Sequence, residues 1–425
     1  MPVTVHIPTA LRKFTSGAQS VELPAAPLPD LLDHLVARFP DVSRHLRDDH
    51  GELRRFLNIY VNDEDIRFLG GAAYKFKDGD DVLLVPAIAG GAPANSEWFA
   101  ASGPASSANL GCAFDCAALA LNLRLRARAI LRDDPGFDVK YNGPNPERVP
   151  CDASNLVVEG IVRFAAARGA NISGADVEIE SEIPVGVGLG SSAAAIVCGL
   201  FLGAALLRVE PDREEILTLA AKMEGHPDNA AAACHGGLVF AAQDSESRRV
   251  LYARTSLPPD LILLAVIPPT ATFTHAARAV LPGEYSRADA VHNMQRASLL
   301  AAICFSGASG LEQELFRDRM HQPYRVPNVP GLAECLEVKH PDLLGVCMSG
   351  SGSAALAFVR GNEIEIGYML AKPFADRGAA PKVIILLPES LGAKIEASPA
   401  TLSAPAEIQI AARAAAGSES RPCKS

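Results

Sequence analysis

Residues 183–207 read IPVGVGLGSSAAAIVCGLFLGAALL, and the architecture expected for most of the chain depends on them. Glycine occupies every second position from Gly186 to Gly190, and the missing Cβ atoms let backbone N–H groups approach an anion closely. Ser191 and Ser192 stand where a helix N-cap is expected, and the apolar run after them predicts a buried helix. A glycine loop that leads into a helix N-terminus can bind phosphate. Taken alone, the pattern fits a glycine-rich turn before a core helix equally well, because it matches neither the Walker A nor the Rossmann spacing.

Composition and charge exclude several classes of protein. The chain has 425 residues, of which 48% are hydrophobic and 21% charged, as in a globular protein of about three domains. The net charge of −10 argues against nucleic acid or a membrane surface as a partner, so a phosphate site must create its positive potential locally. The N-terminus lacks a signal-peptide core, and no apolar run reaches the roughly 20 residues that span a bilayer. Nine cysteines without a C-x-x-C pair predict reduced thiols in the cytoplasm, and we interpret Cys112 and Cys116 as small apolar residues.

The first 91 residues have the pattern of a β-grasp domain. The expected elements are strands at 2–7, 20–23, 56–62 and 81–88 and a helix at 28–40. Gly90 and Gly91 then form a thin, extended end that fits a narrow adenylating active site, although a Gly-Gly pair is more often a simple linker. Residues 92–104, rich in small residues and proline, are expected to be the linker to the rest of the chain.

This first segment resembles the ThiS/MoaD-like sulfur carriers, most closely the CysO-type carriers of cysteine biosynthesis. The similar stretches are VTVHIPTALRKFTSGAQSVEL, RFLNIYVNDEDIRFLGG and DGDDVLLVPAIAGG, which cover nearly all of residues 1–91. The resemblance implies a terminal carboxylate that becomes a thiocarboxylate. It implies as partners an adenylating sulfurtransferase, a metalloprotease that cuts after diglycine, and a PLP-dependent sulfhydrylase. Because Ala92 and a further domain follow Gly91, sulfur chemistry requires cleavage after Gly91; otherwise the domain is only a solubilising or docking appendage.

Several polar features of the remaining chain point to one phosphoryl-transfer site. A second turn, MSGSGSAALAF at 348–358, repeats the glycine–serine pattern of the first. A helix expected at 213–225 carries Glu224 near its end, and Arg278 and Arg325 stand near polar turns. Residues 104–121 are expected to lead from small polar residues into a helix-like apolar run. Any one of these features is common, but together they favour a kinase.

In order along the chain, these segments resemble homoserine kinase of the GHMP kinase superfamily. The stretches that carry the resemblance are PASSANLGCAFD, PVGVGLGSSAAA, EGHPDNAAAACHGG, THAARAVLP, HQPYR and MSGSGSAALAF, within about 104–390. The implied fold is mixed α/β, with an ATP-binding lobe at 105–255, a second lobe at 256–395 and a frayed tail at 396–425, in which 407–416 is a candidate short helix. The implied protein is a cytoplasmic homodimer that makes O-phospho-L-homoserine for threonine biosynthesis. Another small-molecule kinase of the superfamily, or a regulatory protein with an inactive kinase fold, are the alternatives.

The resemblance also assigns binding roles to individual residues. ATP is expected to contact Pro184, Val185, Gly186, Val187, Gly188, Leu189, Gly190, Ser191, Ser192, Ala193, Gly350 and Gly352. The implied Mg²⁺ ligands are Ser192 and Glu224, although Glu224 and His226 are closer in sequence here than in some family members. The implied homoserine contacts are Asn109, Asp115, His226, Thr274, Arg278 and Arg325. Guanidinium forks suit the carboxylate, while Asp115 and Asn109 can hold the ammonium group.

The expected catalytic residues are Asn229, Asp228 and Arg278. Mevalonate kinase relatives place an aspartate base near this point, and the resemblance puts Asn229 there instead. Asp228 is therefore structural or at most a candidate base. We expect proton loss assisted by the substrate itself, with positioning supplying most of the catalysis.

Overall fold

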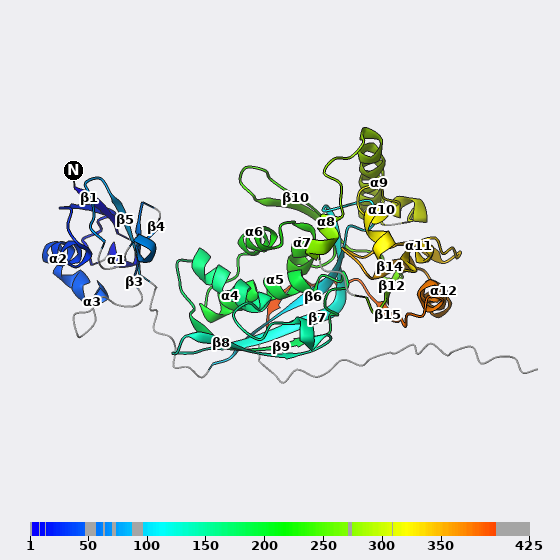
Figure 1. Ribbon diagram of the computed structural model, residues 1–425, viewed down its shortest axis with the longest axis horizontal. Coiled ribbons are helices and arrows are strands. Elements are labelled where there is room, and N and C mark those ends of the chain that lie inside the picture. The colour runs from blue at the N-terminus through cyan, green and yellow to red at the C-terminus, as the bar shows by residue number, and fades with distance from the viewer. Residues whose placement is uncertain are drawn as a thin grey trace, which may run out of the picture. The chain divides into compact units, whose positions relative to one another are not determined.

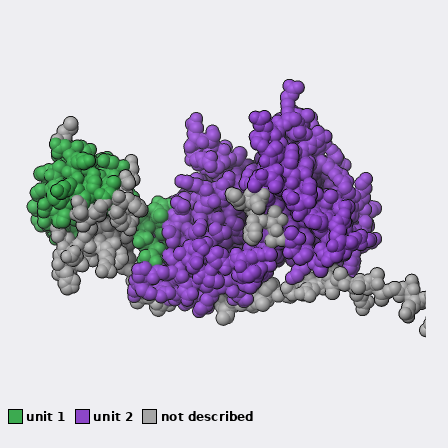
Figure 2. Space-filling view, in the orientation of Figure 1, with its two compact units in different colours: residues 1–97, 165–173 green, residues 98–164, 174–425 purple. Residues whose placement is uncertain are grey.

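The computed structural model (Figure 1) describes residues 2–7, 9–12, 14–46, 57–62, 64–69, 74–86, 97–270, 274–307 and 309–396. The chain divides into two compact units, residues 1–97 with 165–173 and residues 98–164 with 174 onward (Figure 2). Gly90, Gly91 and the candidate helix at 407–416 lie outside the described residues. No helix among the described residues has the length and hydropathy needed to cross a membrane.

The first unit contains a five-stranded sheet with the order β2-β1-β5-β3-β4. Its strands are β1 (Val3–His6), β2 (Ser20–Leu23), β3 (Leu57–Val61), β4 (Glu64–Asp65) and β5 (Asp81–Pro86). Its helices are α1 (Thr9–Arg12), α2 (Leu28–Arg38) and α3 (Ser43–Leu46). Strands β1 and β5 are parallel and the other pairs antiparallel. Helix α2 buries leucines at positions 28, 31, 32 and 35, the helical spacing that places them on one face. The arrangement is the β-grasp that the sequence predicts.

The second unit begins with a seven-stranded sheet. Its main order is β11-β10-β7-β6-β16, and β9 pairs with both β7 and β8. The strands are β6 (Phe99–Ala108), β7 (Ala117–Leu131), β8 (Gly136–Asn142), β9 (Gly174–Ser181), β10 (Leu238–Gln243), β11 (Val250–Thr255) and β16 (Lys394–Ile395). The helices of this part are α4 (Leu156–Ala167), α5 (Ser191–Leu206), α6 (Arg213–Glu224) and α7 (Asp228–His235). Helix α5 packs against β6 and β7 and is buried from Ala193 to Leu206, as its uninterrupted apolar sequence predicts.

A second, four-stranded antiparallel sheet has the order β13-β14-β12-β15. Its strands are β12 (Ile262–Ile267), β13 (Leu343–Met348), β14 (Ala355–Val359) and β15 (Lys382–Leu386). The helices around it are α8 (Thr274–Ala279), α9 (Arg287–Phe305), α10 (Gln322–Arg325), α11 (Leu332–Cys335) and α12 (Glu363–Ala375). Side chains such as Leu264, Val346 and Phe374 form the core between this sheet and α12. The turn between β13 and β14 is the second glycine–serine turn.

Three expectations from sequence are wrong in this unit. Residues 99–104, expected as linker, are the first half of β6, and they are small because α5 lies on this strand: a Cβ at Gly103 would be 3.1 Å from the Ala194 carbonyl oxygen. The apolar run after Asp115 is β7 rather than a helix, because pairing with β6 and β9 overrides its alanine–leucine content. The segment 256–395, expected as the second lobe, ends in β16, which pairs with β6 of the seven-stranded sheet and not with the second sheet.

Candidate active site

The first glycine loop has a backbone that only glycine can adopt at its key positions. Gly186, Gly188 and Gly190 all have positive φ, between 69° and 84°. A Cβ at Gly188 would lie 2.1 Å from the carbonyl oxygen of Ser349, and a Cβ at Gly190 would lie 2.2 Å from the Ser106 hydroxyl. The loop ends with Gly190 as the N-cap of α5, without a side-chain cap. The expectation that a serine caps this helix is therefore wrong.

The loop presents a row of unpaired donors. Within the part of the chain that the structure describes, the backbone N–H groups from Gly186 to Ser192 donate to no protein acceptor. The preceding N–H group, of Val185, is held by the side chain of Asn145 at 3.2 Å. Unpaired N–H groups at the start of a sixteen-residue helix attract anions through both hydrogen bonding and the helix dipole. The loop therefore has the geometry of a phosphate site.

The second glycine–serine turn is fastened to this loop. The Ser349 hydroxyl donates to the carbonyl oxygen of Gly188 at 2.7 Å, and the Asn109 side chain donates to the carbonyl oxygen of Gly350 at 2.9 Å. The backbone N–H of Gly350 donates to Ala108 at 3.1 Å. Two turns that are far apart in the sequence thus form one rigid wall.

A cavity of about 350 Å³ opens beside this wall. Most residues that the sequence singles out line it, namely Asn109, Asp115, Val185, Gly186, Gly188, Leu189, Gly190, Ser191, Ser192, Glu224, His226, Asp228, Asn229, Arg278, Arg325 and Gly350. Pro184, Val187, Ala193 and Gly352 do not line it. Thr274 begins α8, but its side chain lies outside the described residues.

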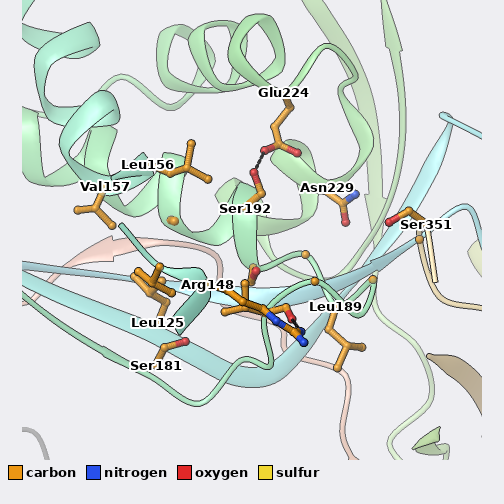
Figure 3. A pocket seen from close by; sticks show the side chains of 18 of the residues that line it. Leu125, Arg148, Leu156, Val157, Ser181, Leu189, Ser192, Glu224, Asn229 and Ser351 are labelled. Atoms are coloured by element: carbon orange, nitrogen blue, oxygen red, sulfur yellow. Dashed lines mark hydrogen bonds between the residues drawn. The ribbon is translucent and has the colours of Figure 1, made fainter. Parts of the chain in front are cut away.

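Ser192 and Glu224 meet at one side of the cavity (Figure 3). The Ser192 hydroxyl donates to the Glu224 carboxylate, although the two residues stand on different helices, α5 and α6. The Glu224 side chain is only 9% exposed, and burial raises the pKa of its carboxyl group. Two oxygen atoms from a hydroxyl and a buried carboxylate, beside a row of N–H groups, are the type of donor that Mg²⁺ prefers. The residues present therefore fit the metal.

His226, Asp228 and Asn229 form a compact polar cluster at the start of α7. The Asp228 carboxylate, 1% exposed as a residue, contacts Nδ1 of His226 at 2.7 Å and accepts the backbone N–H of Asn229 at 2.6 Å. Burial alone lowers the pKa of His226, but the hydrogen bond with Asp228 and the nearby acids outweigh it and raise that pKa overall. The Asn229 side-chain oxygen accepts the Ser106 hydroxyl at 2.8 Å. Through Oδ1, Asp228 thus contacts both His226 and Asn229.

The two arginines differ sharply in their surroundings. Arg278 makes a bidentate ion pair with Asp115, with distances of 3.0 and 2.7 Å, and Asp115 itself has a positive φ of 55°. Arg325 is 4% exposed, and no carboxylate of a described residue pairs with it. Burial, together with the charge of Arg278, lowers the pKa of Arg325. A buried guanidinium without an acid partner attracts an anionic group of a ligand.

Several lining residues escape sequence reasoning. Part of the cavity lining is apolar and comes from residues such as Leu125, Tyr141 and Val157. Arg148 lies beside the glycine loop (Figure 3), where it donates to the Val185 carbonyl oxygen at 3.0 Å. No motif marks these residues; Leu125 lies on β7 and Tyr141 on β8, two strands that both pair with β9.

Comparison with known proteins identifies two families in the chain. The family model described as the ThiS family matches residues 5–91, and the one described as the GHMP kinases N terminal domain matches residues 155–237. The homoserine kinase of Solibacter usitatus is 40% identical over 267 residues, which are 62% of this chain and 86% of that protein. The homoserine kinase of Deinococcus radiodurans is 38% identical over 301 residues, or 70% of this chain and 97% of that one.

Solved structures show the same similarity. The crystal structure of homoserine kinase from Cytophaga hutchinsonii matches with a TM-score of 0.63 and 25% identity, and covers 72% of this chain and 99% of that one. Together with the ThiS match, this confirms the predicted fold class, an N-terminal β-grasp followed by a two-lobed kinase fold of mixed α and β structure. The roles of individual site residues stay predictions.

Proposed function

The chain belongs to the homoserine kinase family of the GHMP kinase superfamily, and from that premise we propose how its residues act. The reaction transfers the γ-phosphoryl group of ATP to the hydroxyl of L-homoserine and yields ADP and O-phospho-L-homoserine. The observation that carries the assignment of the site is that two features line one cavity. One is the row of unpaired N–H groups from Gly186 to Ser192, and the other is the buried guanidinium of Arg325, which has no acid partner among the described residues.

We propose that the N–H groups of the glycine loop hold the ATP phosphates. The apolar end of the cavity, with Leu125 and Tyr141, then accommodates the base. The loop contains no lysine, so Arg148 and a bound cation must supply positive charge. Ser192 and Glu224 would hold Mg²⁺, which when bound neutralises phosphate oxygens.

Homoserine is a zwitterion, so its pocket needs both an anion site and a cation site. The carboxylate is assigned to Arg325, because Arg278 is paired with Asp115 while Arg325 has no acid partner among the described residues. The ammonium group is assigned to Asp115, whose oxygens each retain a lone pair beside Arg278. Asn109 keeps the two turns together, since its amide donates to Gly350 and accepts the backbone N–H of Asp115.

The chemical step follows from which groups are free. The homoserine hydroxyl oxygen forms a bond to the γ-phosphorus, and the bond from that phosphorus to the bridging oxygen of ADP breaks. Asp115, Glu224 and Asp228 each already have a hydrogen-bond or ion-pair partner among the described residues, so we assign none of them as a general base. The hydroxyl proton therefore passes to the transferred phosphoryl group, while Asn229 orients the substrate.

A substrate panel tests the assignment. Purified full-length chain is incubated with γ-labelled ATP, Mg²⁺ and one of L-homoserine, mevalonate or galactose, and the labelled product is separated. We expect labelled O-phospho-L-homoserine and little transfer to the other two. Preferential transfer to mevalonate or galactose would instead indicate another kinase of the superfamily. Absence of transfer to every acceptor would indicate an inactive kinase fold.

We further propose that residues 1–91 act as a sulfur carrier after cleavage at Gly91. The match to the ThiS family and the β-grasp of the first unit support this role. O-phospho-L-homoserine carries a leaving group on its γ-carbon, so one chain would supply both an electrophile and the precursor of a sulfur donor. The adenylating sulfurtransferase, the diglycine-cleaving metalloprotease and the PLP-dependent sulfhydrylase named above are the proposed partners, in the cytoplasm.

Intact-mass spectrometry of the protein from its native cells tests the carrier role. A fragment that ends at Gly91, accompanied by a form heavier by one oxygen-to-sulfur exchange, is expected when sulfur amino acids are scarce. Only uncut chain under that condition would reduce the first unit to an appendage of the kinase.

A further inference from the structure

The orientation of Arg325 is determined by three acceptors that all lie within the second unit. Its Nε donates to the Ala277 carbonyl oxygen at 3.0 Å, and its Nη1 lies 3.4 Å from the Gly350 carbonyl oxygen and 3.3 Å from Nδ1 of His321. A guanidinium has five N–H donors, and these contacts use three of them. The two protons of Nη2 have no partner among the described residues. They remain for a ligand in the cavity that Arg325 lines.

The contact with Arg325 determines the tautomer of His321. A guanidinium can only donate, so Nδ1 of His321 must carry a lone pair and act as the acceptor. The proton of the neutral ring then sits on Nε2, which donates to the carbonyl oxygen of Gly111 at 2.8 Å. Burial lowers the pKa of the fully buried His321, consistent with a neutral ring.

His321 is itself held firmly in place. The fully buried Asp318 carboxylate accepts the backbone N–H groups of Met320, His321 and Gln322 at 2.6–2.9 Å, and it accepts the side chain of Asn293 at 2.7 Å. The Phe114 ring stacks on the imidazole with a centroid distance of 5.2 Å. The ring therefore has one orientation, with one nitrogen toward Arg325 and the other toward Gly111.

Through Nε2, His321 also contacts the turn at 109–111, which precedes Asp115, the acid assigned to the ammonium group. Asn109, Leu110 and Gly111 all have positive φ, and a Cβ at Gly111 would lie 2.1 Å from the Phe316 carbonyl oxygen. The Asn109 side chain accepts the backbone N–H of Asp115 at 3.0 Å. His321 thus links the guanidinium assigned to the carboxylate with the turn that presents the acid assigned to the ammonium group.

We propose that His321 is a positioning residue for homoserine: as the Nε2–H tautomer, it accepts from Nη1 of Arg325 and thereby directs Nη2 into the cavity. The proposal rests on the assignment of Arg325 to the homoserine carboxylate. His321 touches no substrate in this scheme. Its effect is on the binding of homoserine and not on the binding of ATP, whose phosphates are assigned to the N–H groups of the glycine loop.

Two substitutions test the roles of the two nitrogen atoms of the His321 ring separately. His321→Asn keeps an oxygen near the position of Nδ1 and can still accept from Arg325, whereas His321→Gln replaces Nε2 and leaves no acceptor at Nδ1. Loss of a hydrogen bond to a charged group should raise KM for homoserine roughly 10-fold or more in His321→Gln, with kcat and the KM for ATP retained. His321→Asn should raise that KM less. His340→Gln is the matched control, because Nδ1 of His340 also accepts an N–H, that of the Asp342 backbone, and Asp342 does not line the cavity whereas Arg325 does.

The outcomes distinguish this inference from the function on which it rests. A wild-type chain that does not phosphorylate homoserine, or an Arg325→Lys variant with unchanged KM for homoserine, contradicts the proposed function. If Arg325→Lys weakens homoserine binding but His321→Gln does not, or if the two His321 variants raise KM equally, the positioning role is wrong. Should His321→Gln not fold, ¹⁵N-histidine NMR of the wild-type chain decides: an unprotonated Nδ1 supports the proposal, and a protonated Nδ1 overturns it.

Discussion

Replacement of Ser192 by alanine removes a single hydroxyl, and the structure separates its effects on stability and on catalysis. Ser192 is the second residue of α5, and its hydroxyl binds Glu224 rather than capping the helix. The variant therefore loses no N-cap interaction. It leaves the Glu224 carboxylate buried, with Nε2 of His226 at 3.9 Å.

The two magnitudes follow from these contacts. A hydrogen bond to a charged group contributes about 1.5–3 kcal/mol, so we expect the free energy of unfolding to fall by about 2 kcal/mol. This cost applies above the raised pKa of Glu224 and decreases as pH falls through it, because the protonated carboxyl is easier to bury. Loss of transition-state stabilisation at a phosphoryl-transfer site costs on the order of 10²–10³ in kcat/KM, or about 3–4 kcal/mol. Activity should therefore fall by more than stability does.

Two measurements on one pair of variants test this reasoning. We would record urea unfolding of the second unit and steady-state kinetics over a series of Mg²⁺ concentrations. Ser286→Ala is the control: Ser286 caps α9 by accepting the N–H of Asp289 at 3.1 Å, so it should lose about 1 kcal/mol of stability and no kcat/KM. If Ser192→Ala turns over as fast as the wild-type chain at saturating Mg²⁺, the assignment of Ser192 to the metal is refuted.

Other predictions concern the arginines, one histidine and the glycine loop. Arg325→Lys should raise KM for homoserine about 10-fold while KM for ATP stays constant, because lysine keeps the charge but not the fork; an equal rise in both would indicate a folding defect. Burial lowers the pKa of His235 to about 4 from 6.5, so stability present above pH 6.5 should be lost as pH falls toward 4, by about 3 kcal/mol in all. His235→Phe should flatten this dependence in urea titrations at several pH values, and an unchanged slope would exclude His235 as its source. Gly188→Ala should cost at least about 2 kcal/mol and weaken ATP binding in thermal-shift assays, whereas Gly283→Ala, with open space around its Cβ, should do neither.

Local sequence was sufficient where residue type restricts the structure directly. The alternating glycines from Gly186 to Gly190 predict a loop whose backbone N–H groups can approach an anion, and the apolar run after them predicts the buried α5. The β-grasp was also predictable from local patterns, since α2 carries its leucines on one face and turn residues separate the strands. The alanine-rich run of β7 was not, because neighbouring strands outweigh its helical propensity.

The motifs of the sequence also predicted many residues of the site, but not what each one contacts. The similarity to homoserine kinases named Ser192, Glu224, Arg278 and Arg325, and all four line one cavity. Nothing in the sequence distinguishes the two arginines. Only the structure pairs Arg278 with Asp115 and leaves Arg325 without an acid, because the three segments meet only when the two sheets pack together.

The sequence by itself therefore determined the backbone of the phosphate loop, the buried helix behind it and the order of the family motifs. These depend on the absence of a Cβ, on apolar periodicity and on residue type, all of which are local. The tertiary structure alone decided that β6 begins where a linker was expected, that Arg148 and Tyr141 line the cavity, and that His321 faces Arg325 with its Nδ1 lone pair. Those outcomes depend on which donors and acceptors remain unpaired after distant segments have packed, and no local pattern records that balance.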